Sequence, residues 1–237
     1  MASSRHNTST AFKPGGTAIL ARNSITARIK SHTRDRMGRW TSICLSTADS
    51  KKLRIISAYQ VCHQTRPGSN TAAAHQTAQI IEESAQSLSI HRAHPRQAFI
   101  RDLQSFISHQ QSEGEDIILA GDFNEEITST DSGMNQLATA CSLVDLFSIR
   151  LGTSDQPATY QRGSRRIDYI LVTPTLLPHI KAAGYDPFGY RLPSDHRGMY
   201  LDLDNTAIFH EDLTPLEAAA KRDFNTKAPG VVLKYVT

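Results

Sequence analysis

The sequence predicts an α/β fold, because short β-rich segments predominate along the chain and helical segments lie between them. The composition agrees: the 237 residues are 39% hydrophobic and 21% charged, which is ordinary for a globular domain with a buried core. The longest apolar runs have the length of strands, so neither a signal-peptide core nor a transmembrane helix is predicted. We therefore expect a soluble intracellular protein of the nucleus or the cytoplasm, with no membrane partner.

Four runs rich in β-branched or aromatic residues come first and are bounded by turn residues, at positions 17–21, 25–29, 40–45 and 53–61. The first two are close enough in sequence to form a hairpin. The last two flank the turn-like segment 48–52, so we expect them to be adjacent antiparallel strands.

Helical segments follow and then alternate with strands. Residues 71–88 have helical composition, and residues 95–109 place Phe99, Leu103 and Phe106 on one helical face, so both helices are expected to cover a sheet. The apolar run 116–120 suits a central strand that is buried on both faces. The remaining expected elements are a helix, a strand, a short helical turn and a closing strand, at residues 135–146, 166–172, 176–182 and 198–203.

Charge and cysteine content restrict the partners and cofactors. The net charge of +3 permits a polyanionic partner without by itself indicating nucleic acid. Cys44, Cys62 and Cys141 are widely separated and form no Cys-x-x-Cys pattern, so we expect neither a disulfide framework nor a zinc site. No His-x-x-x-His pattern supports a zinc hydrolase, and no stable protein partner is indicated.

The first of three polar motifs, Gly121-Asp122-Phe123-Asn124, directly follows the predicted central strand. Glycine, aspartate and asparagine are common turn formers, so the motif by itself is equally consistent with the end of a strand. Its functional interpretation is general-base hydrolysis. Asp122 would accept a proton from a water nucleophile, and the Asn124 carboxamide would hold that water or a phosphate oxygen.

The other two motifs suggest a carboxylate–histidine pair. Asp168 lies in the β-branched and aromatic run Arg166-Ile167-Asp168-Tyr169-Ile170, where an unpaired carboxylate would be costly to bury. Histidine is its natural partner, and Ser194-Asp195-His196-Arg197 supplies His196. Asp195 is a candidate ligand for a hard divalent cation. Ser-Asp-His strings are common in surface turns, so the order of all three motifs carries more information than this one alone.

This order of motifs closely resembles the endonuclease/exonuclease/phosphatase superfamily. Five segments are more specifically similar to the endonuclease domains that precede reverse transcriptases in retrotransposon-like polyproteins. They are Gly15-Gly16-Thr17, Gly38-Arg39-Trp40, Ile56-Ser57-Ala58-Tyr59, Thr159-Tyr160-Gln161-Arg162-Gly163 and Ser194-Asp195-His196-Arg197-Gly198. The resemblance covers about residues 13–205. It implies a four-layered α/β sandwich, with two sheets packed face to face, helices outside and a site at one edge.

The resemblance also implies roles for individual residues. Asp122 would be the base for water, Asn124 would orient that water, and Tyr59 would donate a hydrogen bond to a phosphate oxygen. For Tyr59 a place in the core is an alternative, because Gln60-Val61-Cys62 follows it where the family often has a proline-containing loop.

His196 would stabilise the transition state or protonate the leaving group, and Asp168 would orient it. Asp195 would lie near a Mg²⁺ or Mn²⁺ ion. The family also has two upstream strands that end in an asparagine and a metal-binding glutamate, and the segment before residue 15 contains neither motif. We therefore expect a domain that lacks its first strands, binds the metal weakly if at all, and is impaired in activity and stability.

Three parts are expected along the chain: an irregular or disordered N-terminus at 1–12, the superfamily domain at 13–205, and a connector or tail at 206–237 that resembles the segment leading towards a reverse transcriptase.

Basic residues near the motifs are candidate nucleic-acid contacts, with DNA as the expected partner. Arg162, Arg165 and Arg166 flank the Asp168 strand, and a second cluster consists of Arg34, Arg36 and Arg39. Solvated loops are the alternative for both clusters.

The function expected from the sequence is Mg²⁺-dependent phosphodiester hydrolysis by a DNA-nicking endonuclease of a retroelement. Two alternatives stay open. One is a non-catalytic nucleic-acid-binding remnant, and the other is a metal-dependent phosphatase of the same superfamily.

Overall fold

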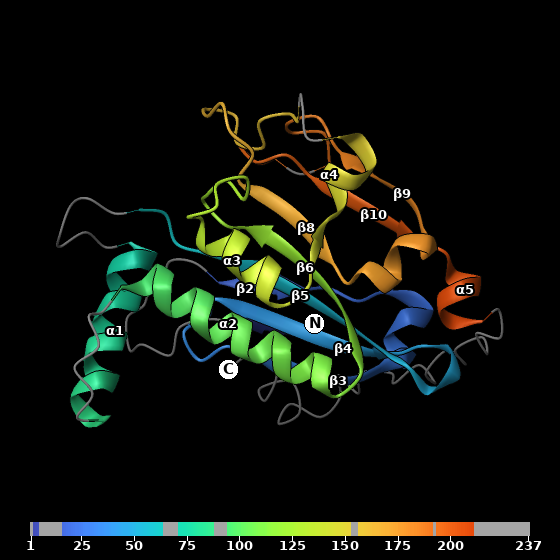
Figure 1. Ribbon diagram of the computed structural model, residues 1–237, viewed down its shortest axis with the longest axis horizontal. Helices are drawn as coiled ribbons and strands as arrows, with labels where there is room; N and C mark the ends of the chain where they lie inside the picture. Colours follow the sequence, from blue (N-terminus) through green and yellow to red (C-terminus); the bar gives the residue numbers. More distant parts are fainter. Residues whose placement is uncertain are drawn as a thin grey trace, which may run out of the picture.

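The computed structural model describes residues 2–4, 16–63, 71–87, 94–152, 156–191 and 193–210. Across these residues, a central sheet carries helices on one face and two small sheets on the other (Figure 1). The central sheet has the strand order β3-β4-β5-β6-β8-β7. Its strands are β3 (Ile29–Arg34), β4 (Trp40–Ser46), β5 (Lys52–Tyr59), β6 (Glu115–Asp122), β8 (Asp168–Val172) and β7 (Val144–Asp145).

Strand β6 lies inside this sheet, as the apolar run 116–120 predicts. It pairs in parallel with β5 and antiparallel with β8. The register places Tyr59 opposite Asp122 and Asp122 opposite Asp168. Strands β4 and β5 are adjacent and antiparallel, which confirms the second hairpin expected from the sequence.

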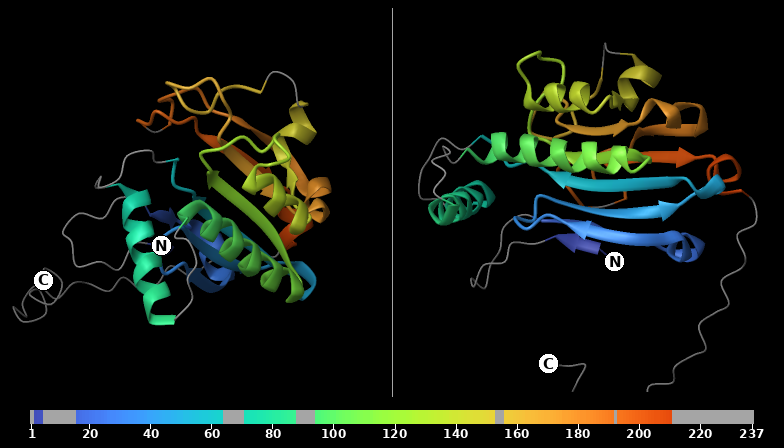
Figure 2. Two further views of the ribbon diagram at one scale, coloured as in Figure 1. Left: turned by 60° about the vertical axis from the view of Figure 1, so that its left-hand side comes forward. Right: turned by 60° about the horizontal axis from the view of Figure 1, so that its bottom comes forward.

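Helices α2 (Pro95–Ser112) and α3 (Gly133–Ala140) cover one face of the sheet, and α2 runs along it (Figure 2). The core on this face is formed by buried side chains of the sheet and the two helices, among them Trp40, Ile56, Leu119, Leu171, Phe99, Leu103 and Leu137. Helix α1 (Ala72–Ser87) packs beside α2, and its Ala72 and Ala73 contact Val61 in the segment that follows β5.

The opposite face carries two antiparallel pairs, β1 (Ala2–Ser4) with β2 (Thr17–Ile19) and β9 (Ile180–Tyr185) with β10 (Met199–Leu203). The second core lies here and includes Leu45, Leu53, Val172, Phe147 and Phe209. Two short helices close it, α4 (Leu146–Leu151) and α5 (Asn205–Phe209). Sheets packed face to face with helices on the outside confirm the mixed α/β class.

Two segments differ from the sequence-based expectation near the N-terminus. Residues 25–28 do not form the expected strand, because they belong to the 3₁₀ helix Asn23–Arg28. Asn23 has φ 56°, a left-handed conformation that asparagine tolerates, and the Thr26 hydroxyl donates to the Asn23 carbonyl at 2.7 Å. Strand β3 therefore begins only at Ile29 and pairs with β4.

The helix expected at 135–146 is also shorter than predicted. It ends at Ala140 because Ser142 has φ 51°, and the Leu143 N–H then donates to the Ala138 carbonyl at 2.8 Å. The segment expected as a helical turn at 176–182 contains the 3₁₀ helix Pro174–His179 and then strand β9. A third short 3₁₀ helix, Ala48–Ser50, lies in the turn between β4 and β5.

At the ends of the chain, residues 2–4 form β1 inside the segment expected to be irregular. Residues 206–209 of the expected tail belong to α5, and residues 211–237 lie outside the described part of the chain. Among the described helices, none is long and apolar enough to cross a membrane.

Leu119 tests the importance of the core beneath α2, because it is fully buried at the centre of β6. We expect Leu119→Ala to lower the free energy of unfolding by about 2–5 kcal/mol, since it removes buried methyl groups and leaves a cavity. Thermal or urea unfolding followed by circular dichroism measures this. Leu20→Ala is the matched control, since Leu20 is 69% exposed. Equal stability of the two variants would contradict this view of the core.

Candidate active site

The candidate site forms at the edge of the central sheet where β5 and β6 end and β8 begins. This geometry brings Tyr59, Asp122 and Asp168 to adjacent register positions although they lie far apart in sequence. Gly121 permits the close approach of β5 and β6. A Cβ atom at this position would lie 1.9 Å from the Ala58 carbonyl oxygen, so a larger residue would force the two strands apart.

The residues after β6 form a fixed turn. Phe123 is fully buried in the core, and its N–H donates to the Ile167 carbonyl at 2.9 Å. Asn124 has φ 50°, and both its backbone N–H and its side-chain amide donate to the Asp122 carboxylate at 3.0 Å. The Asn124 amide also donates to the Gln60 carbonyl at 2.8 Å. These bonds hold the Asp122 carboxylate and the Asn124 amide side by side.

His196 reaches the same place from the C-terminal part of the domain. Its Nδ1 lies 3.0 Å from Oδ2 and 3.2 Å from Oδ1 of Asp168, so the hydrogen bond expected from the sequence is present. Because the carboxylate accepts, Nδ1 carries the proton and Nε2 is left for another partner. Asp168 is itself buried, with 6% exposure, and its N–H donates to the Thr159 hydroxyl at 3.1 Å.

The segment around Thr159 holds His196 in position. Gln161 donates its N–H to the Asp195 carbonyl, and Arg197 donates its N–H to the Thr159 carbonyl, both at 2.8 Å. Tyr160 and His196 form an isolated bridge, with ring centroids 5.1 Å apart. The two loops are therefore joined by backbone bonds on both sides of the histidine.

Asp122, Asp168 and His196 form a cluster of candidate metal ligands, with one ligand atom from each lying within 4.8 Å of the others. Two carboxylates supply the hard oxygen ligands that Mg²⁺ and Mn²⁺ prefer. Their mutual repulsion would be relieved by a cation, so the donor set fits a divalent ion.

The electrostatics of the cluster agree with this conclusion. Burial, and then the charge of Asp168, raise the pKa of Asp122 to about 6. The hydrogen bond to Asp168 raises the pKa of His196 against the opposing effect of burial, with smaller contributions from the charges of Asp122 and Asp195. A carboxyl group with a pKa of about 6 beside an imidazole with a raised pKa is suited to proton transfer.

Tyr59 lies half-buried beside Asp122, at the end of β5. Burial, and then the charge of Asp122, raise the pKa of its hydroxyl to about 12, so the phenol stays protonated and can donate. The side chain also packs against Val61, Ala72 and Ala73. Its position is compatible with both the phosphate contact and the packing role that the sequence left open.

The structure does not place Asp195 and Arg166 in the cluster. Asp195 is exposed and is not one of the three clustered ligands. Arg166 is only 7% exposed, its guanidinium pairs with Asp145, and it lies over the Tyr169 ring at 4.3 Å. This position corrects the expected nucleic-acid contact of Arg166, because a buried, paired guanidinium is not presented to a phosphate.

Arg162 and Arg165 are exposed, and Arg165 lies 3.6 Å from the Glu126 carboxylate. In the second basic cluster, Arg39 is buried and paired with Asp35 and Asp102, whereas Arg34 and Arg36 are not buried. Of the three arginines that flank the Asp168 strand, Arg162 and Arg165 are therefore the exposed ones.

Sequence reasoning missed two residues that support the site. The Thr159 hydroxyl accepts from the N–H groups of both Ile167 and Asp168, and Gln60 binds Asn124 through its carbonyl. Thr159 opens one of the family-like segments, which is a usable signal in the sequence. No sequence signal identifies Gln60, because its contribution here is a backbone group.

The raised pKa of Asp122 predicts that this residue destabilises the fold at neutral pH. The folded protein binds the proton more tightly than the unfolded chain, so the cost is full above pH 6 and disappears only as the pH falls below the ordinary pKa of 3.8. In EDTA, we expect Asp122→Asn to be more stable than the wild type by about 1–3 kcal/mol at pH 8, with a much smaller difference at pH 4. Unfolding at several pH values tests this, and a variant less stable at pH 8 would contradict it.

Comparison with known proteins identifies the family. The model of the Endonuclease/Exonuclease/phosphatase family matches residues 3–196. Among solved structures, AP endonuclease LMAP from Leishmania major has 14% sequence identity and a TM-score of 0.51 over 75% of this chain and 62% of that chain. This likeness concerns the fold alone. No curated protein sequence gives a significant match.

Two further structures are similar at lower TM-scores. The 3′ phosphatase NExo from Neisseria, bound to a product DNA hairpin, has 18% identity and a TM-score of 0.47 over 74% of this chain and 71% of that chain. The 3′-5′ exonuclease NExo from Neisseria meningitidis has 19% identity and a TM-score of 0.44 over 72% and 66%. Because the family model covers most of the sequence and the three motifs meet at one sheet edge, this protein belongs to the Endonuclease/Exonuclease/phosphatase family of hydrolases.

Proposed function

We propose that this protein hydrolyses phosphodiester bonds in DNA with a divalent metal, as the nicking endonuclease of a retroelement. The observation that carries the proposal is the Asp168–His196 hydrogen bond beside the Asp122–Asn124 turn. In this proposal Asp122 is the general base, Asn124 supplies an amide and His196 a polarised imidazole, all at the same edge of the central sheet. The five segments similar to retrotransposon endonucleases support the retroelement role.

In the proposed mechanism, the Asp122 carboxylate accepts the proton of the attacking water, and the Asn124 amide, fixed by Asp122 and Gln60, orients that water. Asp168 holds the His196 ring and favours its protonated form, in which Nδ1–H donates to Asp168 and Nε2–H donates to the phosphate as negative charge develops on it. The Tyr59 hydroxyl donates to a second phosphate oxygen. These groups need only small movements, because backbone bonds fix each of them.

Asp122 and Asp168 would hold the Mg²⁺ or Mn²⁺ ion, with Asp195 close by. When bound, the cation supplies Lewis-acid stabilisation of the phosphate charge. Within the described cluster the carboxylates number two, so we propose that the ion binds weakly and that the chain is a slow enzyme. Exposed Arg162 and Arg165 would position the DNA backbone.

Nicking of supercoiled plasmid DNA in Mg²⁺, Mn²⁺ or EDTA tests the activity. We expect slow nicking in either metal and none in EDTA. His196→Ala and Asp122→Asn should each reduce the rate by about 10²–10⁴-fold, because they remove charge stabilisation and proton transfer. The matched control variants are His32→Ala and Asp49→Asn, because both residues are exposed and neither belongs to the site.

Activity retained in both site variants would mean that the reaction occurs elsewhere. DNA binding without nicking in either metal would favour the non-catalytic remnant. Hydrolysis of a small phosphomonoester without nicking would favour the phosphatase.

A second prediction concerns Arg162 and Arg165. In EDTA, the double variant Arg162→Ala with Arg165→Ala should bind duplex DNA more weakly. The slope of the logarithm of its binding constant against the logarithm of the salt concentration should be shallower by about 2, because two phosphate contacts are lost. Fluorescence anisotropy over a range of salt concentrations measures both effects. Arg22→Ala, at another exposed arginine, serves as the control and should leave the slope unchanged. An unchanged slope in the double variant would remove these residues from the interface.

A further inference from the structure

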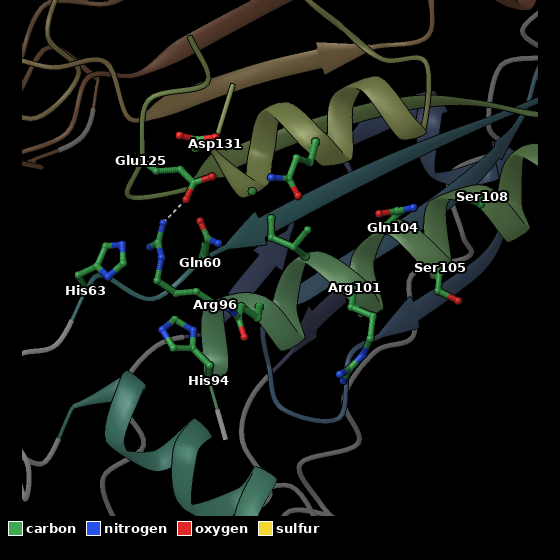
Figure 3. Close-up of a pocket in the computed structure, with 14 residues that line it drawn as sticks. Gln60, His63, His94, Arg96, Arg101, Gln104, Ser105, Ser108, Glu125 and Asp131 are labelled. Carbon is green, nitrogen blue, oxygen red and sulfur yellow. Dashed lines mark hydrogen bonds and ion pairs between the residues drawn. The ribbon is translucent and has the colours of Figure 1, made fainter. Parts of the chain in front are cut away.

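A cavity of about 740 Å³ lies next to the candidate site, between the end of β5, helix α2 and the beginning of α3 (Figure 3). Its volume is within the range of about 300–1,000 Å³ that is typical of small-molecule sites. Amide side chains from several elements line it, namely Gln60, Gln97, Gln104 and Gln136, and Ile100 adds an apolar surface. The proposed mechanism uses none of these side chains.

Gln60 is the residue in this cavity that most needs a partner. It is 1% exposed, and neither its Oε1 nor its Nε2 has a hydrogen-bond partner in the described part of the chain. A buried amide without partners is costly, since it loses hydrogen bonds to water and gains none in return. The last torsion of glutamine is broad, so rotation presents both atoms to a molecule in the cavity.

The charges around the cavity favour a neutral ligand. Arg96 donates to the Val61 carbonyl at 2.5 Å, and its positive charge is compensated by an ion pair with Glu125 (Figure 3). The charge of Arg96, and then burial, lower the pKa of His63, which keeps this imidazole neutral. Arg101 pairs with Asp102. A phosphate therefore finds no free cluster of positive charge among these residues.

The cavity is connected to the candidate site through Gln60 itself. The Gln60 carbonyl accepts from the Asn124 amide, and the Gln60 N–H donates to the Asp122 carbonyl at 2.9 Å. Glu125, which lies in the cavity wall, directly follows Asn124. Residues that line the cavity are thus directly bonded to, or next in sequence to, the groups that would act on the phosphate.

We propose that this cavity binds one unpaired nucleobase of the DNA strand, and that the Gln60 amide forms paired hydrogen bonds with the edge of that base. A carboxamide offers a donor and an acceptor side by side, which matches the adjacent acceptor and donor groups of a base. The inference rests on the proposed action on DNA and adds that the site takes a strand with an unstacked base.

Fluorescence anisotropy in EDTA tests this inference without any cleavage. The probes are labelled single-stranded dodecamers of dA, dC and dT and one dodecamer of stable abasic residues. We expect at least one base-containing probe to bind about 5–150-fold more tightly than the abasic probe. Gln60→Leu should abolish this difference between the base-containing and abasic probes. Gln76→Leu is the matched control, because Gln76 is 3% exposed but lies in α1, outside the cavity lining.

A second pair of variants avoids changes in the core. Ser105→Trp introduces an indole into the cavity from an exposed position of α2 and should also abolish the difference. Ser112→Trp, near the end of the same helix and outside the lining, should preserve it. Thermal unfolding establishes that each variant is folded.

Equal binding of base-containing and abasic probes by the wild type would overturn the inference. A difference that survives both Gln60→Leu and Ser105→Trp would do the same. These outcomes are separate from the proposed function: plasmid nicking with equal probe binding rejects the cavity alone, whereas base-dependent binding without nicking in any metal rejects the hydrolase and keeps the cavity.

Discussion

The pairing of β6 between β5 and β8 is the constraint on which the rest of the molecule depends. This strand contributes side chains to both cores, and its end carries the Asp122 turn. Its parallel partner β5 can approach closely because position 121 is glycine. If β6 were displaced, the helical face, the second core and the candidate site would all lose their common support.

The site brings together two carboxylates that repel each other. The carboxylates of Asp122 and Asp168 lie in a partly buried cluster, and burial makes this repulsion more costly than it would be in water. Hydrogen bonds from Asn124 and His196 compensate for part of the cost. Such local instability on a rigid sheet is characteristic of sites that bind a cation or transfer a proton, because function requires charges that folding alone would avoid.

Local signals in the sequence were sufficient for the elements with strong periodicity. The strand 116–120 and helix 95–109 were located correctly because long apolar patterns determine which face is buried. The pattern does not locate the elements at 25–29 and 135–146 correctly, because a single left-handed residue redirects the backbone in each case, Asn23 in the first and Ser142 in the second. One dihedral angle of this kind leaves no trace in hydrophobic periodicity.

The sequence by itself determined the α/β class, the family and the three motifs, because residue type and order carry that information locally. The pairing of Asp168 with His196 was also expected from the sequence. Only the tertiary structure decided how closely Asp122 lies to this pair, that Asp195 stays outside their cluster, and that Arg166 is buried against Asp145. It also revealed the unpaired amide of Gln60 beside a cavity. These features depend on strand register and on contacts between distant segments, and both are properties of the packed chain that no local pattern encodes.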